Sequence, residues 1–243
     1  MSRQAFRSWS WIVSLSLILF SQSNLLAEEN EADPFENVNR KIFAFNDFFD
    51  RILLKPVAKG YQFITPNFVD RGVTNFFSNL DDVVVVVNDL LQGKVVQAGQ
   101  DSARFLVNTT IGVVGVFDVA SKMGLAKHEE DFGQTFGKWG LSSGPYIVLP
   151  FLGPSNVRDA FGRVPDYFAY PANHIDDDAT RLGLTAVDLV DTRADLFSAE
   201  ALISGDRYSF IRDAYLQRRE FLVTDGEVED DFLDEDFDDE DYF

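Results

Sequence analysis

Residues 140–144 read Gly-Leu-Ser-Ser-Gly and match the G-x-S-x-G pattern, in which a serine nucleophile occupies a sharp turn. Because His174 lies downstream, the pattern suggests a serine esterase or phospholipase that uses Ser142. Such a turn requires an apolar strand before the serine and a helix after it. The flanking residues, which include Gly137 and Pro145, fit neither element. We therefore expect no enzyme and keep hydrolysis through Ser142 as an alternative.

Other groups that could do chemistry are few. The chain has no cysteine, which excludes a thiol nucleophile, a disulfide and a thiolate metal site. His128 and His174 are too isolated for a zinc site, and the contiguous Asp176, Asp177 and Asp178 lack the spacing of a calcium loop. We expect no cofactor and no metal. The net charge of −19, from 21 Lys and Arg against 40 Asp and Glu, argues against a nucleic-acid partner, because phosphates require clustered positive charge.

The two ends of the chain differ in composition from the rest. In residues 1–27, Arg3 and Arg7 precede an apolar run that is too short for an ordinary spanning helix. This pattern predicts a cleaved secretory signal peptide, followed by one helical domain over residues 28–223. Residues 224–243 contain twelve acidic residues and no basic one, which predicts a disordered acidic tail. The tail would serve either solubility or the attraction of a basic partner.

Apolar spacing between these ends predicts helices. A first helix begins at Glu36, and we expect Lys55-Pro56 to end it, because proline lacks a backbone donor. Its apolar face has spacings of four, three, four and three, and consists of Val38, Ile42, Phe45, Phe49 and Ile52. Further helices are predicted for residues 69–80, 95–108, 118–123, 155–161, 177–196 and 206–223.

Two stretches are harder to assign. Thr65 and Pro66 have the residue types of a helix start, and Asp81 with Asp82 would open a separate helix over residues 83–91. That helix contains five consecutive valines, which would normally indicate a strand. We favour a helix because acidic residues precede the run and Gly93 follows it.

Residues 131–159, here called the central connector, are crowded with glycine, proline and aromatic residues. The apolar run at residues 146–149 is too short for a helix, so we expect an irregular, tightly folded connector between helices. After the helix that follows, we expect Pro165 and Pro171 to break the chain around Tyr167, Phe168 and Tyr170. The chain also contains 24 phenylalanines, which would either fill an aromatic core or contact lipid.

Several short motifs occur in the chain in a specific order. The central connector contributes Asp131-Phe132-Gly133-Gln134-Thr135, Gly144-Pro145-Tyr146, Leu149-Pro150, Gly153-Pro154-Ser155 and Arg158-Asp159. The rest of the chain contributes Asp33-Pro34-Phe35-Glu36, Asn39-Arg40, Asn75-Phe76, Asn79-Leu80, Asn88, Leu91-Gln92-Gly93, Arg104-Phe105, Asn108-Thr109, Thr192-Arg193-Ala194 and Tyr215-Leu216-Gln217-Arg218. Over residues 33–223 the chain resembles the MlaA (VacJ) family, outer-membrane phospholipid-transport components of Gram-negative bacteria.

The resemblance implies a fold and a function. It implies an all-α protein with a single helical domain, shaped as a disc or ring and embedded in the inner leaflet of the outer membrane. It also implies an amphipathic channel that passes misplaced outer-leaflet phospholipids to a soluble periplasmic lipid-carrier protein, which maintains lipid asymmetry. Family members associate with trimeric porins. The implied location is the periplasmic side of the outer membrane.

One feature departs from the family. Many members carry a lipidated cysteine after Leu-x-x, whereas Glu28 follows Leu25-Leu26-Ala27 in this chain. We therefore expect no covalent lipid anchor and expect attachment through apolar surface or a partner. The alternative function is that of a soluble periplasmic lipid-binding protein.

Site residues can be proposed for a lipid channel. The uncharged run at residues 111–117 is either a buried glycine-rich turn or a mobile apolar gate beside a lipid path. Arg193 and Arg212 would either contact phosphate head groups or pair with carboxylates on the helix surface. The candidate channel and gate residues are therefore Ile111, Gly112, Val113, Val114, Gly115, Val116, Phe117, Arg193 and Arg212.

Overall fold

A computed structural model describes residues 33–227 of the chain. The predicted signal peptide and all but the first four residues of the predicted acidic tail lie outside this range. The described part is predominantly helical, which confirms the expected all-α class.

The described elements follow in chain order. They are α2 (Glu36–Phe49), the π-helix η1 (Asp50–Leu54), α3 (Lys55–Ile64), α4 (Asn67–Gln92), α5 (Val95–Thr110), α6 (Val119–Lys122), α7 (Phe132–Lys138), β1 (Tyr146–Leu149), β2 (Gly153–Asn156), α8 (Val157–Ala169), the 3-10 helix η2 (Pro171–His174), α9 (Asp178–Glu200) and α10 (Arg207–Val223). Side-chain oxygens cap the start of α6 to α10, because each accepts a hydrogen bond from a free N–H of the first turn; the caps are Asp118, Asp131, Asn156, Asp177 and Asp206.

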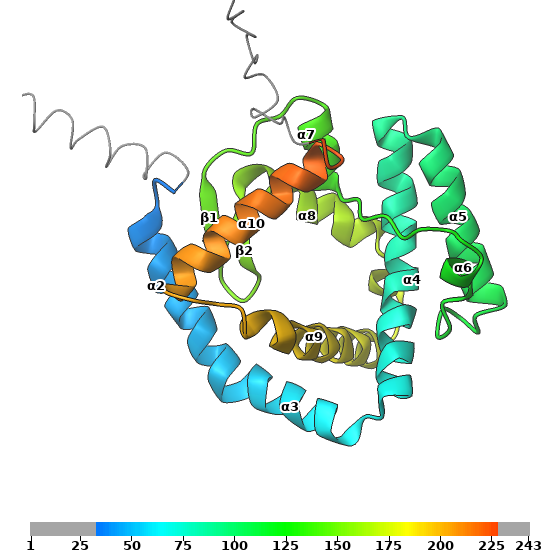
Figure 1. Ribbon diagram of the computed structural model, residues 1–243, viewed down its shortest axis with the longest axis horizontal. Helices are drawn as coiled ribbons and strands as arrows, with labels where there is room; N and C mark the ends of the chain where they lie inside the picture. The colour runs from blue at the N-terminus through cyan, green and yellow to red at the C-terminus, as the bar shows by residue number, and fades with distance from the viewer. Residues whose placement is uncertain (1–32, 228–243) are drawn as a thin grey trace, which may run out of the picture.

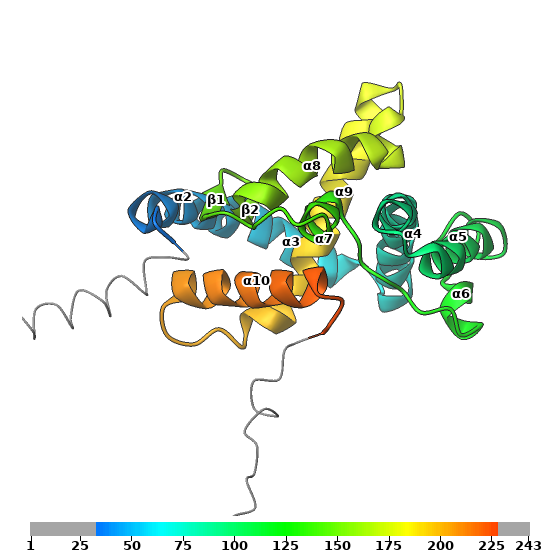
Figure 2. The same ribbon diagram turned by 90° about the horizontal axis from the view of Figure 1, so that it is seen from above.

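The helices follow one another around a closed path instead of forming a bundle (Figure 1). The elements α2 and α3 make one arc, α4 closes the next side, and α7, α8 and α10 lie opposite α3. Helix α9 packs beside both α3 and α4. Seen from above, α2, α3, α4 and α5 lie in one layer, with α10 on one side of it and the junction of α8 and α9 projecting on the other (Figure 2).

The first helix is longer than its sequence predicts. Pro56 does not end it, because the chain runs through the π-helix η1 directly into α3. Pro56 occupies the second position of α3, where a missing backbone donor is tolerated. Thr65, expected to begin the next helix, instead terminates α3 with an extended backbone.

Helix α4 joins two segments that the sequence separates. Asp81 and Asp82 do not open a new helix, since α4 continues from Asn67 to Gln92. The five valines are helical, as expected, and Gly93 ends the helix with a left-handed backbone, φ +80°. Packing against α5 outweighs the β-propensity of the valines.

The central connector is more regular than expected. Its apolar run forms β1, which pairs antiparallel with β2 and places Tyr146 opposite Asn156. Asn39 on α2 holds this hairpin, because its side chain accepts from the N–H of Val148 at 2.9 Å and donates to the carbonyl of Tyr146 at 3.1 Å. Pro165 does not break the following helix, since α8 continues through it to Ala169.

The distribution of polarity is unusual for a soluble protein. Among the described residues, eighteen buried side chains are polar or charged and eleven are hydrophobic, while many large apolar side chains are exposed. Within residues 33–227, no helix combines the length and the apolar character that crossing a membrane requires.

Helices α4 and α5 meet through buried carboxyl groups. The side chains of Asp89 and Asp101 are fully buried. Gln97 donates to Asp89 at 2.8 Å, and Nδ1 of His128 lies 2.8 Å from a carboxylate oxygen of Asp101. Burial raises the pKa of Asp89 to about 7, and the carboxylates of Asp101 and Glu130 contribute to the shift. Asp89 therefore keeps its proton in the folded protein under mildly acidic conditions.

This raised pKa predicts a pH dependence of stability. The unfolded chain releases the Asp89 proton near pH 4 and the folded chain only near pH 7, so the free energy of unfolding should fall as the pH rises through this window. Asp89→Asn should reduce that fall, as measured by thermal unfolding in detergent between pH 4 and pH 8. Asp213→Asn, at an exposed position of α10, is the control and should keep the wild-type profile. Superimposable profiles of the wild type and Asp89→Asn would contradict the assignment.

Candidate functional site

Residues 111–117, here called the 111–117 turn, form a compact connection between α5 and α6. The N–H of Gly115 donates to the carbonyl of Asn108 at 2.8 Å. From α4, the side-chain amide of Asn75 donates to the carbonyl of Val116 at 3.1 Å. The turn is thus hydrogen-bonded both internally and to α4, while most of its apolar side chains are exposed.

The two glycines of the turn are buried and leave no room for a side chain. A Cβ atom at Gly112 would lie 2.2 Å from a backbone oxygen, and one at Gly115 would lie 2.6 Å from Cβ of Asn79. Gly115 also has a φ of +86°, while Val113 and Val114 adopt φ values of 56° and 59°, which are uncommon for β-branched residues. Because substitution of either glycine would disrupt the turn itself, such variants would not isolate a gating role.

A cavity of about 630 Å³, here called the apolar cavity, lies beside the turn. Helices α4 and α9 form two of its walls, and Val116 with Phe117 form part of a third. Its lining is almost entirely apolar and includes Phe68, Val69, Val73, Phe76, Phe77, Leu184 and Val187.

A second cavity of about 540 Å³, here called the polar cavity, adjoins the first, because Phe77 and Leu184 line both. It lies between α4, η2 and the first half of α9. Its lining mixes aromatic, amide and charged side chains, among them Tyr167, Tyr170, Asn173, Asp178, Arg181 and Asp188.

The two candidate arginines are not part of either cavity lining. Arg193 on α9 forms a two-pronged ion pair with Asp50, at 2.7 and 3.0 Å, and a further pair with Glu200 at 3.0 Å. Arg212 on α10 pairs with the adjacent Asp213 at 2.8 Å. Both guanidinium groups therefore occupy the carboxylate-paired state that the sequence offered as the alternative to phosphate binding.

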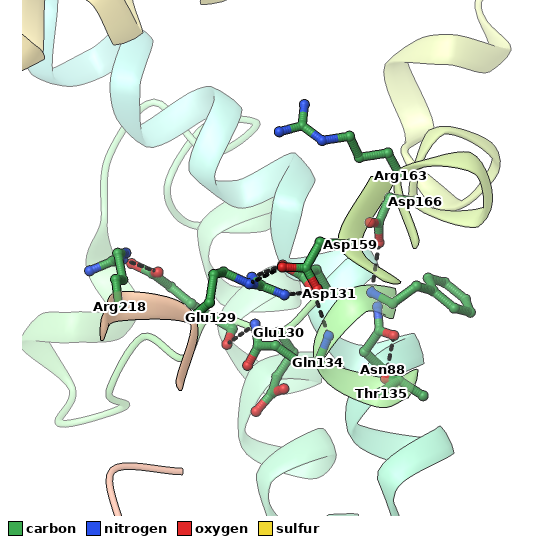
Figure 3. Close-up of polar contacts among 12 residues, drawn as sticks. Asn88, Glu129, Glu130, Asp131, Gln134, Thr135, Asp159, Arg163, Asp166 and Arg218 are labelled. Atoms are coloured by element: carbon green, nitrogen blue, oxygen red, sulfur yellow. Dashed lines mark hydrogen bonds and ion pairs between the residues drawn. The ribbon is translucent and has the colours of Figure 1, made fainter. Parts of the chain in front are cut away.

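The central connector carries a cluster of polar contacts (Figure 3). From α10, Arg219 donates to Asp131 at 2.9 Å and lies 2.7 Å from an oxygen of Asp159. Although burial acts to raise it, the adjacent Arg219 holds the pKa of Asp159 below its usual value. Thr135 donates to the side-chain oxygen of Asn88 at 2.6 Å and links α7 to α4. The signature residues of the connector therefore hold α4, α7, α8 and α10 together.

The geometry around Ser142 does not match a nucleophile elbow. Helix α7 precedes the serine and strand β1 follows it, which reverses the order that the elbow requires. His174 is engaged elsewhere, since its Nε2 lies 2.7 Å from the carbonyl of Phe168. In the part of the chain that the structure describes, no group of three or more metal-ligating side chains could hold an ion.

Sequence reasoning missed the acidic groups that α4 and α9 turn toward each other. Asp81 on α4 lies near Asp188 on α9, whose carboxylate acts to raise the pKa of Asp81. The spacing of Asp188, Asp191 and Asp195 indicates one acidic helix face, which the sequence could have revealed. The proximity of Asp188 to Asp81 depends on the packing of α4 against α9, which no local pattern contains.

Fold and site together define a class of protein: a ring of helices with many exposed apolar side chains, mostly polar buried side chains, and an apolar cavity between two helices. Residues 31–222 match the family model described as MlaA lipoprotein, so the chain belongs to the MlaA family. This finding confirms the resemblance that the ordered motifs indicate.

Individual relatives agree with the family assignment. The chain is 33% identical over 220 residues to the intermembrane phospholipid transport system lipoprotein MlaA of Escherichia coli K12. This match covers 88% of this chain and 87% of the relative. It is 35% identical over 202 residues to the protein of the same name from Haemophilus influenzae, with 81% of each chain covered. An uncharacterized protein of Rickettsia felis is 38% identical over 195 residues, or 79% of this chain and 78% of its own.

A solved structure supports the fold. It comes from work on the structural basis for maintenance of bacterial outer membrane lipid asymmetry, and it superimposes with a TM-score of 0.70 at 34% identity. The match covers 79% of this chain and 99% of that structure.

The buried position of Arg219 predicts a large effect of its removal. Arg219→Met should lower the free energy of unfolding by about 3 kcal/mol, because Asp131 loses its cation and the buried carboxylate of Asp159 keeps only Arg158. The control is Arg218→Met at the neighbouring exposed ion pair with Glu129, which should change stability by about 1 kcal/mol or less. Thermal unfolding in detergent would measure both; equal losses would show that the Arg219 cluster is not a main support of the fold.

Proposed function

We propose that this chain is an outer-membrane component of phospholipid trafficking. It lies in the inner leaflet, receives misplaced outer-leaflet phospholipids and passes them to a soluble periplasmic lipid-carrier protein. This transfer maintains the lipid asymmetry of the outer membrane. The names of the Escherichia coli and Haemophilus influenzae relatives, intermembrane phospholipid transport system lipoproteins, support this role.

The observation that carries the proposal is the apolar exterior. Around the junction of α3 and α4, at the rim in Figure 1, the exposed fractions of Phe63, Ile64 and Phe68 are 90%, 75% and 77%. Exposed apolar surface of this kind is unfavourable in water and favourable in hydrocarbon. One leaflet contributes about 15 Å of hydrocarbon, and a helix with its side chains is about 10 Å wide, so helices lying in the membrane plane fit within a leaflet.

The polar cavity provides the other half of the proposed mechanism. Moving a charged or zwitterionic head group through hydrocarbon is costly, and a route lined by polar side chains lowers that cost. No bond is formed or broken in this process. A trimeric porin would cover part of the exposed apolar surface and help to hold the chain in the membrane. The apolar rim also favours this function over that of a soluble lipid-binding protein.

Membrane attachment through the rim can be tested directly. Phe63→Asp places a charge in the proposed hydrocarbon contact and should shift much of the full-length protein from the outer-membrane fraction to the soluble periplasmic fraction. Gln62→Asp adds the same charge at the neighbouring exposed polar position and should leave the protein in the membrane. Fractionation of cells with quantitative immunoblotting measures the ratio. A wild-type protein found in the soluble fraction would favour the periplasmic carrier.

We further propose that the 111–117 turn gates the apolar cavity, since Val116 and Phe117 form part of its wall. Phe117→Ala should open this wall and change the rate of labelled-phospholipid transfer between vesicles and the purified protein severalfold. Phe151→Ala removes an exposed phenylalanine beyond β1 and should leave the rate unchanged. Transfer at the wild-type rate by Phe117→Ala, with its helical content intact, would refute the gate.

A further inference from the structure

The apolar and polar cavities meet on α9 and offer different chemistry. Val187 faces the apolar cavity and Asp188, the next residue, faces the polar one. Phe77 and Leu184 lie at the border, because they line both. A ligand that occupied both cavities would therefore need an apolar part and a polar part joined at that border. Both volumes fall in the usual range for small-molecule sites.

The polar cavity contains a negative charge without a matching cation. The charge of Arg181 is already balanced by Asp178, and one of its N–H groups donates to the carbonyl of Ile175 at 2.9 Å. Asp188 forms no salt bridge with any residue in the range 33–227. Burial and the nearby carboxylate of Asp191 raise its pKa. A partly buried carboxylate in this position is costly to keep ionised unless a cation approaches it.

Neighbouring groups make the cavity suitable for an ammonium group. Asp81 on α4 lies close enough to Asp188 for their charges to interact. Burial and these two carboxylates raise the pKa of Tyr170. Tyr167 and Tyr170 line the same cavity, and aromatic rings attract cations through their π-faces. Arg181 is two helical turns before Asp188 on the same face of α9 and still has unused donors for a phosphate oxygen.

We propose that the polar cavity binds the head group of an ammonium-bearing, zwitterionic phospholipid through Asp188, while the apolar cavity holds its acyl chain. This assignment rests on the proposed trafficking function and adds head-group selectivity to it. An anionic phospholipid lacks the ammonium group that Asp188 needs and is repelled by the unpaired carboxylates. The site should therefore discriminate between the two classes of phospholipid.

The test is a competition between two lipids. The full-length protein, purified in detergent, is incubated with vesicles of equimolar phosphatidylethanolamine and phosphatidylglycerol, and retained lipid is quantified by mass spectrometry. We expect roughly tenfold enrichment of phosphatidylethanolamine, as for one charge-assisted hydrogen bond. Asp188→Asn should bring the ratio close to one with the total retained lipid unchanged, and Asp188→Glu should restore the enrichment.

The control and the outcomes separate this inference from the proposed function. Asp195→Asn neutralises a carboxylate on the same helix that lines neither cavity, and it should keep the wild-type ratio. Equal retention of both lipids by the wild type, or enrichment that persists in Asp188→Asn, would overturn the head-group assignment and leave the trafficking function standing. A protein that neither retains nor transfers any phospholipid would overturn both.

Discussion

The buried side chains of the described residues are mostly polar, so the fold depends on hydrogen bonds and ion pairs between helices more than on an apolar core. Arg219 provides such contacts for α7, α8 and α10 through Asp131 and Asp159. Asn39 does so for α2 and β1, where one amide satisfies two backbone groups of the hairpin. Removal of any such partner leaves the others buried without compensation, which is more costly than the loss of the contact itself.

Because hydrogen bonds and ion pairs stabilise the buried polar side chains, many large apolar side chains are left on the surface. A soluble domain of this size would bury its large hydrophobic side chains, whereas Phe63 and Phe68 are largely exposed here. Helices α2 to α5 lie in one layer, and many of their large apolar side chains are exposed, which suits the proposed position in one leaflet. The two cavities beside α4 and α9 likewise combine apolar and charged side chains in their walls.

The motif residues mostly serve this framework. Asn75 and Asn79 on α4 attach the 111–117 turn and the end of α5, through Val116 and Thr109. The central connector likewise positions its neighbours through Thr135, which reaches Asn88 on α4. These side chains fix the backbone around the cavities, while α4 and α9 supply most of the cavity walls.

The sequence alone determined the helical class, most helix starts and the family, because capping residues, apolar spacing and ordered motifs are local signals. It predicted a helix from Asp177 or Asp178 and another from about Asp206, and the side chains of Asp177 and Asp206 cap α9 and α10. Only the tertiary structure decided that helices continue through Pro56 and Pro165, since surrounding packing outweighs the loss of one hydrogen bond. It also decided that Arg193 is paired and that Asp188 forms no salt bridge within residues 33–227, because these states depend on side chains that meet from distant segments.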